Sequence, residues 1–244
     1  MLKELFADLH LHTALSPCAE EEMTPVAIVE QALAVGLQLL AICDHNTAGN
    51  TAAVQEAAAG RLGVIAGMEI TTAEEAHVVG LFPSAAHAQA AAAEVLATLP
   101  LATAVDLRFG EQLLLQADGT VCGREPHALA QATSFTVDAT VALIHRHAGL
   151  AVAAHLDRPS YSVLSQLGLF PTEAGFDAVE VSAAGRETKR DRLALLGLPL
   201  VTSSDSHFLS DVGICHTALW VAEPTFAELA RALRGDGGRR CSVA

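Results

Sequence analysis

Long apolar runs, paired cysteines and basic residues are all scarce in this chain of 244 residues. Charged residues or glycine interrupt every apolar run well before the ~20 residues that a membrane span requires, so no membrane association is expected. The opening segment, MLKELFADLH, lacks the apolar stretch of a secretory signal. The five cysteines are scattered and odd in number, which disfavours a disulfide framework and favours a reducing cytoplasm.

The small number of basic residues limits the partners that the chain can bind. It has 14 Lys and Arg residues against 28 Asp and Glu residues, a formal net charge of −14. This balance disfavours long nucleic acid as a partner. A small phosphorylated substrate could still bind, provided that metal ions supply the positive charge that attracts it. The hydrophobic share of 51% excludes a disordered chain.

Apolar, β-branched runs alternate along the chain with helical stretches rich in Ala and Leu. The alternation predicts an α/β fold with a parallel sheet or barrel, in one domain over residues 1–244. The expected strands are Leu5–Leu9, Gln38–Cys43, Gly63–Glu69, His77–Phe82, Leu150–His155, Ala178–Val181, Leu200–Ser204 and Ala218–Val221. Helices are expected from Pro25, capped by Thr24, to Gly36, and at Thr47–Ala59, Ser84–Ala97, Asp138–His147, Glu187–Leu196 and Thr225–Leu233.

The stretch from Leu99 to Thr136 breaks this alternation. Asp118-Gly119 stands between two short apolar runs there, which is the signal of a hairpin turn. We expect residues 99–136 to form a hairpin-containing excursion from the barrel, as a cap over the site or an insertion, and not a separate domain.

His10 and His12 are the first residues that point to chemistry. Side chains two residues apart on a strand share one face, so both imidazoles can converge on one metal ion. Asp8 has the same parity and could orient one of these ligands. Alone, two histidines at a strand end are a weak signal, because chance places them there too.

Further candidate ligands stand at the ends of other predicted strands. Parallel α/β barrels build their active sites at the carboxyl edge of the strands, and most of these residues fall at that edge. His77 is the exception, because it begins a strand and would need a reversed strand or an approach through a loop. Cys18 lies in a loop, where a lone cysteine is more often a bystander than a ligand. The remaining candidates are Asp44, His45, Glu69, His155, Asp205 and His207.

Together these residues resemble the PHP (polymerase and histidinol phosphatase) family of metal-dependent phosphoesterases. The resemblance extends over most of the chain, through DLHLHT (Asp8–Thr13), ICDHNT, GMEIT, HVVGLF, AHLDRP and SSDSH (Ser203–His207), but not over residues 99–136. It implies a distorted (β/α)7 barrel of the PHP type, with two or three metal ions at the carboxyl ends of its strands. Histidine with carboxylate ligands suits Zn, Mn or Fe, and their identity stays open.

The resemblance also implies how these ligands are shared. The first metal would take His10, His12, Glu69 and Asp205, and Glu69 would bridge to a second metal completed by His77 and His155. A third would be held by His45, His207 and the residue at the position of Cys18, where many members of the family have His or Asp. Small stand-alone members that begin DLHxHTxxSPC are similar to this chain in having cysteine there. Asp44, next to His45, would orient a ligand without binding a metal itself.

The activity expected from this resemblance is hydrolysis of a phosphate ester, on a small metabolite or a nucleotide, by a hydroxide that bridges two metal ions. Asp205 would act with the other ligands of the metal pair, and His207 would help to bind the phosphate. Arg158, which follows His155 as an arginine does in many relatives, would stabilise charge on the phosphate oxygens. The alternative for Arg158 is a surface arginine before Pro159.

Other functions stay open. A nuclease or phosphodiesterase acting on short oligonucleotides, a non-catalytic metal-stabilised PHP module and a histidinol-phosphate phosphatase would all fit the same motifs. A barrel amidohydrolase also opens with HxH, but it would need a lysine in mid-chain, and lysine occurs only at Lys3 and Lys189. His87, His127 and His216 match no motif and are expected at the surface. His145 and His147 lie two apart in a predicted helix, a spacing that separates their side chains.

Overall fold

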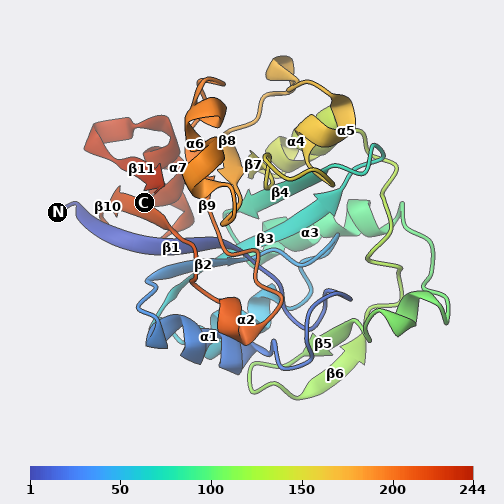
Figure 1. Ribbon diagram of the computed structural model, residues 1–244. Coiled ribbons are helices and arrows are strands. Elements are labelled where there is room, and N and C mark those ends of the chain that lie inside the picture. The colour runs from blue at the N-terminus through green and yellow to red at the C-terminus, as the bar shows by residue number, and fades with distance from the viewer. Residues whose placement is uncertain (244) are drawn as a thin grey trace.

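A nine-stranded sheet curls around the centre of the computed structural model, which describes residues 1–243 (Figure 1). Its order is β11-β10-β1-β2-β3-β4-β7-β8-β9, and the thiol of Cys241 in β11 donates to the carbonyl of Leu200 in β9, so the two edges of the sheet meet. The strands are β1 (Lys3–Leu11), β2 (Leu39–Ile42), β3 (Gly63–Thr71), β4 (His77–Phe82), β7 (Leu150–Ala153), β8 (Ala178–Val181), β9 (Leu200–Thr202), β10 (Thr217–Val221) and β11 (Arg240–Val243). The expected α/β barrel is confirmed, with β11 as a strand that the sequence pattern did not predict.

Helices flank this sheet, mostly where the sequence predicts them. Thr24 caps the first helix by accepting from the backbone N–H of Ala27, and Pro25 occupies its first turn. The one helix of the described residues that lies outside the predicted set is the short α5. The helices are α1 (Pro25–Ala34), α2 (Thr51–Ala58), α3 (Ala85–Leu96), α4 (Val137–Arg146), α5 (Val163–Leu167), α6 (Arg186–Ala194) and α7 (Phe226–Arg234), with short 3-10 turns at Asp106–Arg108, Thr172–Ala174, Leu209–Asp211 and Asp236–Gly238. None of the described helices has the length and hydropathy needed to cross a membrane.

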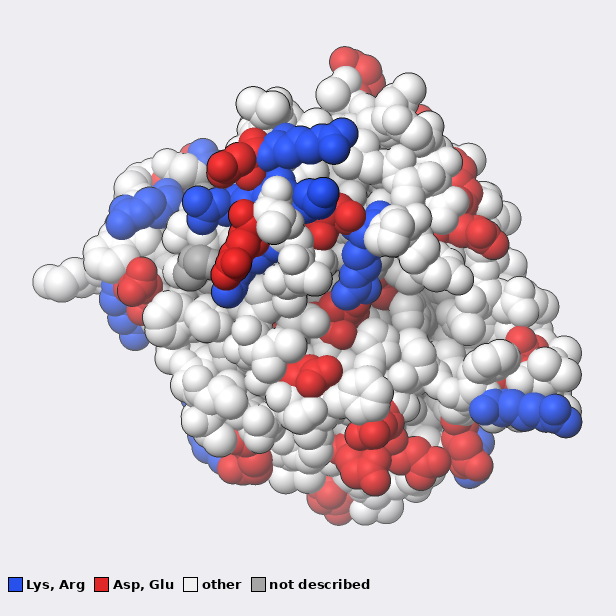
Figure 2. All heavy atoms as spheres, viewed as in Figure 1, with Lys and Arg blue, Asp and Glu red and all other residues white. Residues whose placement is uncertain are grey.

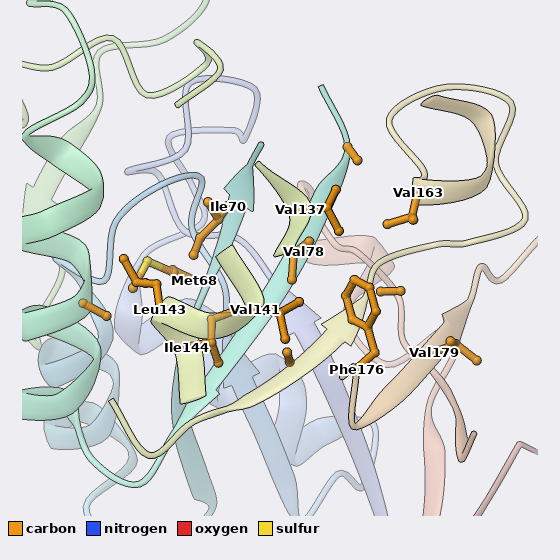
Figure 3. Packing of buried hydrophobic residues seen from close by; sticks show 14 of the residues in the cluster. Met68, Ile70, Val78, Val137, Val141, Leu143, Ile144, Val163, Phe176 and Val179 are labelled. Atoms are coloured by element: carbon orange, nitrogen blue, oxygen red, sulfur yellow. The ribbon is translucent and has the colours of Figure 1, made fainter. Parts of the chain in front are cut away.

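Two apolar clusters hold the sheet in shape. Strands far apart in the sheet order contribute to the first cluster: Leu9 of β1, Leu81 of β4 and Val201 of β9 meet Leu229 and Leu233 of α7. The sheet must therefore wrap around this cluster. The second packs α3 and α4 against β3 and β4; Figure 3 labels Met68, Ile70 and Val78 from the strands and Val141, Leu143 and Ile144 from α4.

Strand direction explains how His77 reaches the carboxyl edge. β1, β2 and β3 are parallel to one another, and so are β7, β8 and β9, but β4 pairs antiparallel with both β3 and β7. The first residue of β4, His77, is thus in register with Thr71, the last residue of β3. The start of this reversed strand lies at the edge where its neighbours end. The structure contains the reversed strand that the position of His77 required.

The excursion forms the predicted hairpin, with β5 (Leu113–Leu115) and β6 (Val121–Arg124) pairing antiparallel. Asn50, at the start of α2, is fully buried and binds the hairpin to the loop after β1. Its side-chain amide donates to Thr13 Oγ1 and to the carbonyl of Leu113, both at 2.9 Å, and its oxygen accepts from the N–H of Leu115. The buried amide of Asn50 therefore helps to position the excursion beside the barrel, together with the backbone bond from Leu113 N–H to the carbonyl of Ala14.

We expect Asn50→Ala to destabilise the protein by about 2–4 kcal/mol, because three buried groups lose a hydrogen-bond partner at once. Urea unfolding followed by circular dichroism would measure the change. Gln131→Ala is the control: that side chain bonds only to the exposed Asp106, so less than about 0.5 kcal/mol is expected. Equal effects of the two substitutions would contradict the role of Asn50.

Candidate metal centre

Glu69 stands at the centre of the site. It lies near the end of β3, is 1% exposed, and is surrounded by imidazoles that arrive from four different strand ends and loops. Nitrogen atoms of five histidines lie between 2.8 and 3.4 Å from its two carboxylate oxygens: His10, His12, His45, His77 and His155. Burial alone would raise the pKa of Glu69, but His77, His10 and His45 hold it well below its ordinary value. Glu69 is therefore an anion surrounded by imidazole nitrogen atoms.

Asp205 and His207 join this cluster from the loop after β9. Asp205 Oδ1 lies 3.1 Å from His12 Nε2 and 3.4 Å from His10 Nε2, and its other oxygen accepts from Arg158 at 2.6 Å. His207 Nδ1 donates to the backbone carbonyl of Asp205, which leaves its Nε2 free to bind another group. The structure thus brings together residues that are almost 200 positions apart in the chain.

Three sets of side chains have ligand atoms close enough to share one ion, within 4.8 Å of one another. The first set, His10, His12, Glu69 and Asp205, is the set that the sequence predicts for the first metal. The second joins His45, Glu69 and His77, and the third joins His12, His45 and His207. His155 reaches Glu69 at 3.1 Å without joining a set. Among the described residues no set includes Cys18, whose side chain is exposed.

The protonation state of His12 tests whether a metal fits. Ser16 Oγ donates its single proton to Asp44, so it must accept from His12 Nδ1, 2.9 Å away. Burial lowers the pKa of His12 to about 4, so the ring is neutral and its Nε2 carries no proton. That bare nitrogen lies 3.1 Å from an oxygen of Asp205 and 3.4 Å from one of Glu69. Lone pairs at these distances repel one another unless a cation lies among them.

Other buried nitrogens at the site support the same conclusion. His10 Nε2, His45 Nδ1, His77 Nδ1 and His155 Nδ1 are buried and lack a hydrogen-bond partner among the described residues. Buried polar atoms without partners are rare in native proteins and require an explanation. Neutral imidazole together with carboxylate is the donor set of Zn, Mn and Fe. These residues therefore fit bound divalent metal ions.

Two carboxylates orient the histidines from behind, and sequence reasoning had identified only one. Asp44 accepts from Thr13 and Ser16, and Ser16 in turn fixes the ring of His12.

Glu180, near the end of β8, is the carboxylate that sequence reasoning missed. It is buried, and one of its oxygens lies 3.1 Å from His10 Nδ1 and accepts from the N–H of His155. The signal that could have identified it was a single acid in the apolar strand AVEV.

Replacing Glu180 with glutamine should weaken metal binding by 10- to 100-fold, the usual effect of removing a carboxylate that orients a histidine ligand. A competition titration against a chelating indicator would measure it. Glu94→Gln is a matched control, because Glu94 binds His147 at 2.7 Å on the surface, away from the site. Unchanged metal affinity in Glu180→Gln would show that His10 keeps its orientation without this carboxylate.

Asp8 has a different role from the one predicted for it. Instead of contacting His10 or His12, its carboxylate accepts from the N–H groups of Ser204 and Gly213, at 3.0 Å each, and from the Ser204 hydroxyl. Burial raises the pKa of Asp8 to about 7 in spite of these bonds. Asp8 therefore attaches β1 to the loop after β9, the loop that carries Asp205 and His207.

A cavity of about 140 Å³ opens onto the cluster. Arg158, Ser160 and Tyr161 line it together with the metal-binding side chains, and the ring of Tyr161 stacks on His77 with their centroids 4.9 Å apart. Tyr161 is the only tyrosine of the chain, and the sequence patterns did not reveal its place. No residue of the range 99–136 lines this cavity, so the excursion lies outside it. Of the surface histidines, His145 pairs with Asp177 at 2.8 Å, away from the cavity.

Comparison with solved structures finds the same fold in several enzymes. The lesion-specific endonuclease Q of Pyrococcus furiosus matches with a TM-score of 0.72 at 17% identity, over 98% of this chain and 58% of that protein. A complex of endonuclease Q with a 27-mer duplex that carries an abasic lesion at the active site matches with a TM-score of 0.67, also at 17% identity and over 98% and 58% of the two chains. A protein from Bifidobacterium adolescentis, described as a metal-dependent phosphoesterase, matches with a TM-score of 0.59 at 23% identity, over 82% and 87%. This chain thus spans little more than half the length of endonuclease Q.

Comparison with protein families assigns most of the chain. The model of the PHP domain matches residues 8–171, and a PHP-associated model matches residues 190–236. The first match begins at Asp8, the start of the DLHLHT motif, and contains Glu69 and His155. Comparison with curated proteins finds no match. In this chain a buried cluster of histidines and carboxylates lies at the carboxyl edge of the sheet, and the match over residues 8–171 shows that the chain belongs to the PHP family.

Proposed function

We propose that this protein is a metal-dependent phosphoesterase that hydrolyses a small phosphorylated metabolite or a nucleotide. The observation that carries the proposal is the buried cluster around Glu69, whose carboxylates and imidazole nitrogens, four of them without a hydrogen-bond partner among the described residues, open into a 140 Å³ cavity bordered by an arginine. Zn, Mn or Fe ions bound there would act as Lewis acids toward phosphoryl oxygens and lower the pKa of bound water. We infer two or three ions, held by the three overlapping sets of ligands.

Each of the three ligand sets would hold one metal ion. His10, His12, Glu69 and Asp205 would hold the first ion, and Glu69 would share the second with His77, beside His155 and His45. His12, His45 and His207 would hold a third. Cys18 is the further ligand proposed for this third site, although its side chain is exposed and belongs to none of the three sets.

Arg158 is suited to bind the phosphate. Its guanidinium gives one hydrogen bond to Asp205, and its other N–H groups have no acceptor among the described residues. An arginine whose side chain is fixed at one nitrogen can use the rest of its planar fork for the non-bridging oxygens of a phosphoryl group. The loss of these contacts would raise KM and lower kcat together, because charge grows on those oxygens in the transition state.

Metal content and turnover measured on one sample would test the proposal. Elemental analysis would precede assays against a panel of phosphomonoesters, a phosphodiester and short oligonucleotides, with and without added Mn. We expect at least two transition-metal ions per chain, and turnover that disappears with chelation and returns with metal. Less than one ion per chain after Mn or Zn is supplied would overturn the site. Full occupancy without turnover would favour a non-catalytic PHP module.

A phosphodiesterase or nuclease is the second candidate. It is favoured by the likeness to endonuclease Q, which was solved with a duplex substrate, although at 17% identity this likeness shows the fold alone. The same panel separates the two activities, since a nuclease would cleave the oligonucleotides faster than any monoester. All five cysteines are free thiols, which is compatible with the cytoplasmic location that we also propose.

A further inference from the structure

Basic residues are unevenly distributed over this acidic protein. Figure 2 shows Lys and Arg gathered over α6, α7 and β11, whereas acidic residues dominate the lower part of the same face. Against a formal net charge of −14, this concentration calls for an explanation. Of the 14 basic residues in the chain, eight lie between positions 186 and 240: Arg186, Lys189, Arg190, Arg192, Arg231, Arg234, Arg239 and Arg240.

Most of the cations in the α7–β11 region already have a partner. Arg231 and Arg239 bind the carboxylate of Glu228, and Arg234 binds Asp236 at 3.0 Å. Arg240 lies over the ring of Trp220, 5.1 Å from its centroid. Side chains engaged in this way stabilise the fold and have little capacity left for a ligand.

Lys189 and Arg192 of α6 differ from these residues. They are three positions apart, so they share one face of the helix, and neither forms an ion pair with a described residue. Together with Arg158 and Ser165 they line a cavity of about 230 Å³ between α6, α5 and the loop after β7. The one acid of this cavity, Asp157, uses both oxygens to accept from the N–H and the hydroxyl of Ser182, at 2.7 Å each.

Arg158 links this cavity to the metal centre. Arg158 lines the 230 Å³ cavity and also the 140 Å³ cavity over Glu69, so the two cavities share this residue. Lys189 and Arg192, which form no ion pair with a described residue, therefore line the second cavity together with Arg158, which also borders the candidate metal centre. The group that best matches a flexible ammonium and a planar guanidinium in one hollow is a phosphate, which accepts from both.

We infer that Lys189 and Arg192 bind a second phosphate group of the substrate while the first lies at the metal centre. The inference deepens the proposed function and rests on it: the favoured substrates carry two phosphates. The second phosphate belongs either to the same small molecule or to the next position of a short oligonucleotide. Its charge is matched by α6, so the acidic balance of the whole chain does not repel it.

The test compares substrates that differ by one phosphate. Fructose 1,6-bisphosphate against fructose 6-phosphate represents the small molecule, and dithymidylate with and without a 5′-phosphate represents the oligonucleotide. In the double variant K189Q/R192Q, we expect KM for the two-phosphate member of at least one pair to rise by about tenfold or more, with kcat little changed. The one-phosphate members should be unaffected. The pair that responds identifies the source of the second phosphate.

Arg190→Gln is the matched control, since it removes a charge from the same helix. Arg190 lines a different cavity and donates to the carbonyl of Val243, so KM should stay unchanged for every substrate. An equal rise of KM for both members of each pair, or an equal effect of Arg190→Gln, would overturn the inference, because either would reflect general charge rather than a phosphate pocket.

Binding without turnover separates this inference from the proposed function. Calorimetry in a Glu69→Gln background would measure the affinity for fructose 1,6-bisphosphate and for the phosphorylated dithymidylate, with and without K189Q/R192Q. A tenfold loss of affinity caused by the double variant would support the pocket even if no substrate in the panel were turned over. Turnover of one- and two-phosphate substrates with equal efficiency, untouched by the double variant, would overturn the pocket and leave the phosphoesterase intact.

Discussion

Replacing Glu69 with glutamine is expected to lower kcat/KM for phosphoester hydrolysis by roughly 10³-fold or more, which corresponds to about 4 kcal/mol of transition-state stabilisation. The reason is its central position. Glu69 lies within 3.4 Å of nitrogen atoms from five histidines and belongs to two of the three ligand sets. Glutamine keeps the size of the side chain but removes the charge that would hold two cations near each other.

Metal content and activity should be measured together for this variant. We expect Glu69→Gln to retain fewer ions per chain than the natural protein while its circular dichroism spectrum stays unchanged. Glu69→Asp is the conservative comparison: it keeps the charge but shortens the side chain, so partial activity with added Mn is expected. Full metal occupancy and near-normal turnover in Glu69→Gln would exclude a bridging role for this carboxylate.

Asp205→Asn should lower kcat/KM by about 10²- to 10³-fold, the range found when one preorganised charge-stabilising group is removed. Burial would raise the pKa of Asp205, but the nearby imidazole of His10 keeps it below its ordinary value, so the side chain is an anion across the working pH range. Its two oxygens face the rings of His10 and His12 on one side and Arg158 on the other. The substitution removes both a proposed metal ligand and the carboxylate that fixes Arg158.

The backbone makes asparagine a clean replacement here. Asp205 has a φ of 54°, in the left-handed region, which asparagine adopts more readily than most other residues. The fold should therefore survive, and thermal unfolding of the metal-free variant should match that of the natural protein. Asp211→Asn, at a partly buried acid six positions away on the same loop that belongs to no ligand set, is the control and should leave turnover unchanged. Normal kcat/KM in Asp205→Asn would remove this residue from the mechanism.

Most of the candidate metal centre could be predicted from the sequence because its residues stand at strand ends, where apolar runs stop and where α/β barrels build their active sites. His10, His12 and Glu69 follow this rule directly. His77 obeys it only because β4 runs in reverse, a fact of strand pairing that no local pattern records. For Cys18, the family resemblance implies a place at the third site, and this stays a prediction, since its side chain is exposed in the loop after β1.

The residues that orient the ligands could not be predicted, because their partners are distant in the chain. Glu180 contacts His10 across 170 positions, and the role of Ser16 depends on Asp44 lying beside it after folding. In the sequence, nothing distinguishes such a carboxylate in a strand or such a serine in a loop, because its partner lies beside it only after folding. Their effect arises from hydrogen-bond geometry, which only the packed barrel defines.

The sequence by itself determined the class of fold, the metal-binding chemistry and the family, since these depend on which residue types follow which strands. Only the tertiary structure decided where charge accumulates. A net charge of −14 predicts repulsion of anions, yet folding places Lys189 and Arg192 without ionic partners beside Arg158. Electrostatic interactions fall with distance and are screened by salt, so an anion near α6 responds to the cations around it more than to the total charge of the chain.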